Sequence, residues 1–100
     1  MKIQWSPLAL DQAEEALEFI AAQGRPGVAA AWLDGLFKRV RELVPFPKQG
    51  RVVPEVGRKE IREVQYEGFR ILYRISPETI GILSVRHSRQ QLLREEVADD

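Results

Sequence analysis

The stretch that decides the fold is residues 61–86, which read IREVQYEGFRILYRISPETIGILSVR. Apolar and polar side chains alternate along three segments of this stretch, and short polar turns separate the segments, as in neighbouring β-strands. Because the turns have the length of hairpin connections, we expect the strands to be antiparallel neighbours. The expected strands span residues 61–66, 69–76 and 80–86.

The middle strand has two chemically different faces. One set of alternating positions holds Phe69, Ile71, Tyr73 and Ile75. The other set holds Arg70, Leu72 and Arg74. Successive side chains of a strand point to opposite faces of a sheet, so the first set is expected to form core and the second to form an arginine face. We expect the chain to leave this arginine face uncovered, for a partner molecule.

Two amphipathic helices are expected before these strands. Ile3 and Trp5 alternate in a short strand, after which Ser6-Pro7 supplies a helix cap and a proline suited to the first helical position. A Gly- and Pro-containing turn at residues 24–27 ends this helix, and a second helix is expected from about residue 28 to residue 43. The apolar stripes comprise Ala9, Ala13, Ala16, Leu17 and Ile20, and then Ala29, Trp32, Leu33, Leu36, Val40 and Leu43.

A short helix is also expected at the C-terminal end, because Ser88 and Gln91 have the spacing of a capping box and apolar residues follow through Val97. The chain of 100 residues is therefore expected to be a single α+β domain, residues 1–100, in the order β-α-α-β-β-β with a C-terminal helix. We expect an antiparallel helix hairpin packed on one face of a small antiparallel sheet, with the first strand at an edge.

The composition excludes several kinds of chemistry. The chain has no cysteine and one histidine, which removes disulfides, thiolate nucleophiles, Fe–S clusters and ordinary zinc sites. There is neither a Gly-rich phosphate loop nor a Gly-x-Ser-x-Gly motif. We expect no metal and no cofactor. No apolar stretch approaches the roughly 20 residues of a membrane span, so we expect a soluble cytoplasmic protein.

Charge is balanced overall but not along the chain. The 15 basic and 15 acidic residues divide into an acidic front over residues 1–37 (net −3), a basic body over residues 38–94 (net +7) and an acidic tail over the last six residues (net −4). This pattern predicts a polarised surface whose basic part faces an anionic partner. The alternative is that the basic side chains are dispersed and solvated.

One enzymatic possibility remains, which is metal-free cleavage of RNA. It requires a base for the 2′-hydroxyl, cations for the phosphate and an acid for the leaving oxygen. Residues of these types are Glu55, Arg62, Arg70, Arg74, Arg86 and His87. The alternative is structural: the arginines pair with cross-strand carboxylates, and His87 is a hydrogen-bonded residue at a strand end. The candidate partners for the arginines are Glu60, Glu63, Glu67 and Glu78.

Several short sequence segments, in their order along the chain, resemble those of the RelE/ParE superfamily of bacterial toxins. They are Ile3-Gln4-Trp5-Ser6-Pro7 leading into a helix, Gly50-Arg51-Val52-Val53-Pro54-Glu55, Ile61-Arg62-Glu63, residues 66–75 and Val85-Arg86-His87-Ser88-Arg89. The resemblance covers residues 2 to about 90. It implies a helix hairpin on a curved antiparallel sheet, in agreement with the periodicity.

The resemblance implies the toxic half of a type II toxin–antitoxin system, in some cases one that stabilises a plasmid. A tyrosine is missing after Arg86 and residues 45–59 are poor in lysine, which favours the ParE branch, whose members inhibit DNA gyrase without chemistry of their own. The alternative is a RelE-type, ribosome-dependent endoribonuclease that cleaves messenger RNA. Its catalytic residues would be Glu55, Arg62, Arg70, Arg86 and His87. A third possibility is an inactive binding domain.

The resemblance also implies two binding surfaces. The residues expected to contact the target are Arg62, Arg70, Arg74, Arg86, His87 and Arg89. The expected partner is a ParD-like, ribbon-helix-helix antitoxin in a hetero-oligomer. An apolar or helical segment of the antitoxin is expected to bind the groove beside the helix hairpin, and its acidic residues are expected to pair with the basic sheet. The residues expected to contact the antitoxin are Leu17, Ile20, Trp32, Leu36, Arg58 and Arg74.

Overall fold

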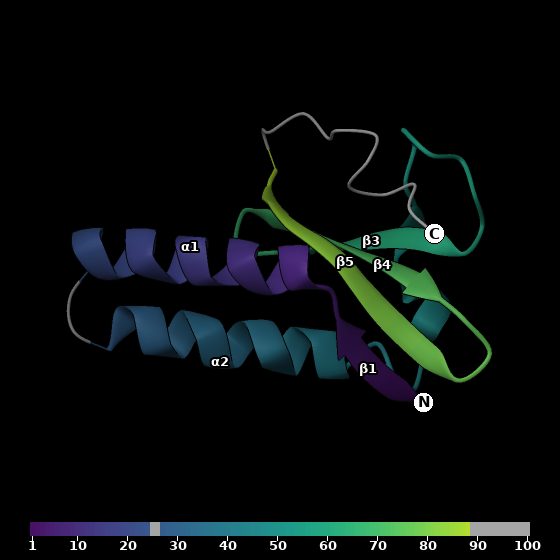
Figure 1. Ribbon diagram of the computed structural model, residues 1–100, viewed down its shortest axis with the longest axis horizontal. Coiled ribbons are helices and arrows are strands. Elements are labelled where there is room, and N and C mark those ends of the chain that lie inside the picture. Colours follow the sequence, from purple (N-terminus) through teal and green to yellow (C-terminus); the bar gives the residue numbers. More distant parts are fainter. Residues whose placement is uncertain (25–26, 89–100) are drawn as a thin grey trace.

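In the computed structural model, two helices lie side by side against one face of a five-stranded sheet (Figure 1). The structure describes residues 1–24 and 27–88. Its elements are β1 (Lys2–Trp5), α1 (Pro7–Gln23), α2 (Val28–Arg41), the 3-10 turn η1 (Pro47–Gln49), β2 (Arg51–Val52), β3 (Ile61–Tyr66), β4 (Phe69–Ile75) and β5 (Thr79–His87). The expected α+β class and the order of the main elements are confirmed. The expected C-terminal helix lies outside the described residues.

The sheet has the strand order β1-β5-β4-β3-β2. Strands β3 to β5 are antiparallel neighbours, as expected, and β1 lies at an edge. The two-residue strand β2 is not among the expected strands, and it pairs antiparallel with β3 at the other edge. The prediction of a purely antiparallel sheet is wrong for the β1 edge, because β1 runs parallel to β5, with Ile3 opposite Ile80. After β1 the chain forms both helices, and the β3–β4–β5 meander that follows ends in β5, which runs in the same direction as β1. A parallel pair needs such a crossover connection.

Turn and cap residues act locally as the sequence suggests. The Ser6 side chain accepts a hydrogen bond from the Ala9 N–H at 3.0 Å and caps α1. Glu67 and Gly68 both have positive φ, 47° and 83°, which is the backbone of a two-residue type I′ hairpin turn between β3 and β4. Helix α2 ends at Arg41, two residues before the expected end.

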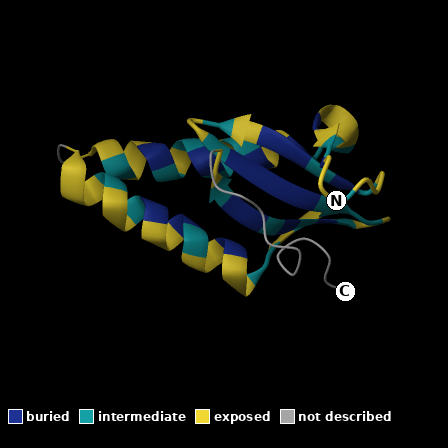
Figure 2. Ribbon diagram, turned by 90° about the horizontal axis from the view of Figure 1, so that it is seen from above, coloured by how far each residue is buried: buried dark blue, intermediate teal, exposed yellow. Residues whose placement is uncertain are grey.

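The main core lies between the helices and the sheet (Figure 2, dark blue). On β4, Ile71 and Tyr73 point into this core, which confirms the alternation predicted for that strand. The opposite face is not left to arginines, contrary to expectation. Leu72 is buried there in a second small cluster with Val53 and Ile61. This cluster forms because the connection between β2 and β3 folds over that face of the sheet, which we call the outer face.

No described helix has both the length and the apolar character needed to cross a membrane.

Candidate functional site

Arg70 lies on the outer face of the sheet and is held by two carboxylates. Its Nη1 and Nη2 atoms donate to the two oxygens of Glu55 at 3.0 Å each, a bidentate pair. Its Nε donates to Glu63, which also accepts from Nε of Arg51. We call Arg51, Glu55, Glu63 and Arg70 the ionic cluster. Arg70 and Glu63 are buried, whereas Arg51 and Glu55 are exposed.

The register of the sheet explains the buried half of this cluster. Glu63 lies opposite Leu72, and Gln65 lies opposite Arg70, so these residues share the outer face. Arg86 is the partner of Arg70 on β5, which places two arginines directly opposite each other. Like charges in that position repel, and the carboxylate of Glu63 offsets part of the repulsion.

Hydrogen bonding between Glu55 and Arg70 shifts the pKa values of both groups. The hydrogen bond from Arg70 is the largest cause that lowers the pKa of Glu55 below its ordinary value. In the same way, the bond to Glu55 is the largest cause that raises the pKa of Arg70. Both groups are therefore charged at neutral pH, and the Glu55 carboxylate is a weaker base than a free glutamate.

Arg62 does not join the other arginines. It lies opposite Tyr73, on the helix side of the sheet. There its guanidinium donates to the carbonyl oxygens of Lys59 at 3.0 Å and Gly50 at 2.9 Å, so it supports the backbone around β2. Arg74 and Arg86 are half-buried, and both have interaction partners. The expectation of an uncovered arginine face is thus wrong for Arg70, which its own chain covers with Glu55 and Glu63.

His87 lies on the helix side of the sheet end, opposite Phe69, and the two ring centroids are 5.6 Å apart. Both rings line a groove of about 740 Å³ between α1 and the ends of β4 and β5, which we call the α1–β5 groove. Phe19, Ile20 and Trp32 line its apolar floor and wall. Within residues 1–24 and 27–88, the buried Trp32 Nε1 has no hydrogen-bond partner.

The residues expected to contact an antitoxin are not all together. Ile20 and Trp32 line the α1–β5 groove, and Leu17 packs at the margin of the main core. Leu36 is completely buried between helix and sheet, so it supports the groove from inside and offers no surface to a partner. Arg58 pairs with Glu60 near the start of β3, away from this groove.

Of the remaining residues expected to contact the target, Arg89 lies outside the described residues. A metal site is not formed by the part of the chain that the structure describes, where no three His, Cys, Asp or Glu side chains gather.

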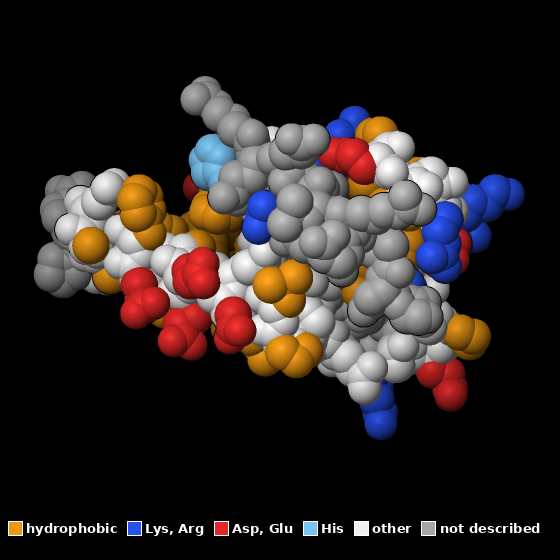
Figure 3. Space-filling model, turned by 45° about the horizontal axis from the view of Figure 1, so that its top comes forward, with side chains coloured by type: hydrophobic (Ala, Val, Ile, Leu, Met, Phe, Trp, Pro, Cys, Tyr) orange, Lys and Arg blue, Asp and Glu red, His pale blue; other side chains and the backbone are white. Residues whose placement is uncertain are grey.

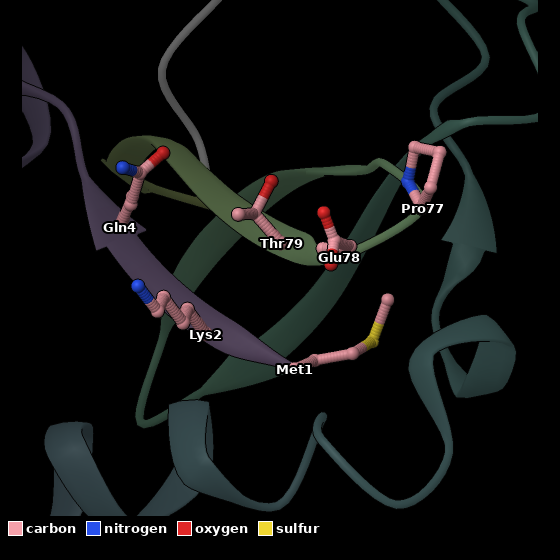
Figure 4. Close-up of a pocket in the computed structure, with 6 residues that line it drawn as sticks. All are labelled: Met1, Lys2, Gln4, Pro77, Glu78 and Thr79. Carbon is pink, nitrogen blue, oxygen red and sulfur yellow. The ribbon is translucent and has the colours of Figure 1, made fainter.

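Sequence reasoning missed a hollow beside η1. It has a volume of about 610 Å³ and is lined by residues 45–49 together with Ile75. The sequence contains a signal for it, because Phe46 stands between two prolines, which restrict the backbone on both sides. A second hollow lies between β1 and the β4–β5 turn, where the side chains of Lys2, Gln4 and Glu78 surround it (Figure 4). It contains no cluster of groups suited to catalysis.

Comparisons with known proteins agree with this architecture. A family model described as "ParE toxin of type II toxin-antitoxin system, parDE" matches residues 3–92. A chain of the chromosomal ParDE toxin–antitoxin system from P. aeruginosa superposes with a TM-score of 0.73 at 19% identity, covering 87% of this chain and 95% of that one. A chain of the RelBE2 toxin–antitoxin complex from Mycobacterium tuberculosis gives 0.53 at 21% identity, covering 86% and 95%. No curated protein sequence matches significantly.

Proposed function

Because the chain belongs to the ParE toxin family of type II toxin–antitoxin systems, we propose that it inhibits DNA gyrase by binding it, in the cytoplasm, without chemistry of its own. A ParD-like antitoxin neutralises it in a hetero-oligomer. The whole chain acts as one toxin domain.

The ionic cluster is the observation that carries this proposal. An RNA-cleaving site needs its base, its cations and its acid around one phosphate. Here Arg70 is occupied by Glu55 and Glu63, and the lowered pKa of Glu55 makes it a poor base. Arg62 and His87 lie on the opposite side of the sheet from Arg70. This separation supports a protein inhibitor over a ribosome-dependent endoribonuclease.

The distribution of charge supports macromolecular binding. Carboxylates line the exposed side of α1, and several Lys and Arg side chains lie at the other end of the molecule, with some carboxylates among them (Figure 3). The exposed acidic residues of α1 are Asp11, Glu14, Glu15 and Glu18. A concentrated acidic surface of this kind helps to orient a basic surface of an incoming partner before contact.

The α1–β5 groove supports an antitoxin contact. Its apolar wall and the exposed ring of Phe19 suit the apolar side of a helical segment. Glu15, Glu67 and Arg86 also line the groove and offer charged contacts to a partner. Part of the binding energy is then electrostatic, and the affinity for the antitoxin falls as salt concentration rises.

The test is controlled expression of the chain in bacteria, with and without a co-expressed antitoxin. A gyrase inhibitor produces gyrase–DNA complexes with broken DNA and a DNA-damage response, and the variants Glu55→Gln and His87→Ala keep this toxicity. Rapid loss of translated messages without DNA breaks, abolished by either substitution, would establish the endoribonuclease instead. A chain that arrests growth in neither way is the inactive binding domain.

A further inference from the structure

Phe46 is the most exposed large hydrophobic residue of the described chain, with 70% of its surface accessible. It belongs to residues 45–49, which we call the Phe46 loop, and it borders the 610 Å³ hollow together with Ile75. Pro45 and Pro47 flank it and restrict the backbone on both sides. An exposed aromatic side chain beside an apolar hollow is typical of a protein-binding surface.

The sheet holds the Phe46 loop in one conformation. The buried hydroxyl of Tyr73 donates to the carbonyl oxygen of Pro47 at 2.6 Å and accepts from the N–H of Gly50 at 3.0 Å. Arg62 adds a hydrogen bond to the Gly50 carbonyl oxygen at 2.9 Å. The loop is thereby tied to β3 and β4 by side chains that are themselves fixed in regular structure.

Helix α2 holds the same loop from the other side. The Gln49 side chain donates to the carbonyl oxygens of Glu42 at 2.8 Å and Phe46 at 3.2 Å. Its own oxygen accepts from Arg39 Nη1 at 3.0 Å. With its backbone fixed on both sides, the Phe46 side chain projects from a preorganised platform, so a partner pays little conformational entropy for ordering it.

The surroundings of the loop are basic. Lys48 lies in the loop. The guanidinium of Arg39 donates to the side-chain oxygen of Gln49, and that of Arg62 donates to the backbone carbonyl of Gly50, next to the loop. Residues 38–51 contain one acidic residue, Glu42, against five basic ones. The five are Lys38, Arg39, Arg41, Lys48 and Arg51. Arg39 pairs with Glu42 and Arg51 with Glu63, so the excess positive charge near the loop rests on the exposed Lys38, Arg41 and Lys48. The complementary partner therefore has an apolar recess bordered by carboxylates.

We propose that the Phe46 loop binds the protein target of the toxin, with Phe46 inserted into an apolar pocket that carboxylates surround. This inference rests on the proposed function and names the part of the toxin that meets the target. The antitoxin is assigned to a different surface, the α1–β5 groove, which lies near the N-terminal end of α2, whereas the Phe46 loop follows its C-terminal end. Trp32 in that groove precedes Arg41, the last residue of α2, by nine residues, or about 14 Å of helix.

The test compares four single variants of the toxin. Phe46→Ala removes the exposed ring, and its matched control is Leu10→Ala, which removes an apolar side chain that is 48% exposed on α1. Lys48→Glu reverses a charge in the loop, and its control is Lys2→Glu, on β1. Since all four side chains are exposed, thermal unfolding is expected to show that each variant is folded.

Affinity for gyrase and for the antitoxin is then measured with the purified proteins, and growth arrest is measured in cells. Phe46→Ala is expected to weaken gyrase binding by about 30-fold or more, as for a central interface residue, and to relieve growth arrest. Lys48→Glu weakens it too and flattens its salt dependence. Neither change alters antitoxin affinity, and both controls behave like the wild type.

The inference is overturned if Phe46→Ala arrests growth as strongly as the wild type. It is also overturned if that substitution lowers antitoxin affinity alone, or if it converts a dimeric wild type into a monomer, since the loop would then contact the antitoxin or a second copy. If the wild type arrests growth without affecting gyrase, the gyrase proposal fails, and the growth phenotype of Phe46→Ala still decides for or against the loop. A wild type without toxicity refutes both.

Discussion

Replacement of Glu63 by glutamine is expected to destabilise the protein by about 3 kcal/mol, the lower end of the range for breaking a buried ion pair, because it leaves the buried Arg70 with the exposed carboxylate of Glu55 as its remaining partner. Only 2% of Glu63 is accessible, and it accepts hydrogen bonds from Arg51 and Arg70. A domain of this size has a free energy of unfolding of about 5–15 kcal/mol, so the loss is a large share of the total.

The matched control is Glu55→Gln, which removes the other carboxylate that pairs with Arg70. The Glu55 side chain is 45% exposed, so solvent already screens its charge, and the expected loss is about 1 kcal/mol or less. Urea unfolding at pH 7, followed by circular dichroism, measures both variants. With a typical slope of about 1–3 kcal/mol per M, Glu63→Gln lowers the midpoint by about 1–3 M and Glu55→Gln by a few tenths to 1 M.

A double substitution distinguishes the loss of the attraction between Glu63 and Arg70 from the cost of burying the Arg70 charge without Glu63. Arg70→Met combined with Glu63→Leu replaces the buried pair with apolar side chains, and it is expected to recover much of the stability that Glu63→Gln loses. If Glu55→Gln proves as costly as Glu63→Gln, or if the apolar pair is less stable than the single variant, burial is not what makes this ionic cluster sensitive. The reasoning applied here to Arg70 would then be refuted.

Three further outcomes are expected. In Gly35→Ala the new Cβ would come within 2.2 Å of the Tyr66 hydroxyl, so calorimetry should show a loss of about 1–3 kcal/mol, whereas Gly81→Ala, with open space around it, stays near the wild type. Tyr73→Phe removes a buried hydroxyl that makes two hydrogen bonds and should cost about 1–3 kcal/mol in urea unfolding. The pKa of Glu55 is lower in the folded protein than in the unfolded chain, so the ionised side chain stabilises the fold fully above its ordinary pKa, and this contribution is lost as the pH falls through the folded pKa. The free energy of unfolding should therefore fall less steeply with decreasing pH in Glu55→Gln than in the wild type. Identical pH–stability curves for the two proteins would contradict this.

Local patterns were sufficient for much of the fold. The alternation of Ile71 and Tyr73 with Leu72 predicted which side of β4 faces the helices. Ser6 followed by Pro7 predicted the start of α1, and its cap hydrogen bond is present. Such signals are readable because they depend on residues a few positions apart, whose relative directions the backbone geometry alone determines.

The candidate site was less predictable. Arg62 and Arg70 were grouped together, yet they lie on opposite faces, because the register of β3 against β4 places Arg62 opposite Tyr73. Counting residues within one strand does not reveal which face of its neighbour it shares. Glu55 was considered as a catalytic base and is instead a partner of Arg70, because the connection after β2 folds back over the sheet.

By itself, the sequence determined the helix hairpin, the three-stranded meander, the absence of cysteine chemistry and the uneven charge, since each depends on composition or on neighbouring residues. Only the tertiary structure decided the parallel pairing of β1, the burial of Arg70 between Glu55 and Glu63, and the exposure of Phe46 on a rigid loop. These features depend on contacts between residues distant in the chain, and the free energy of such contacts is determined by packing that exists only after the chain has folded.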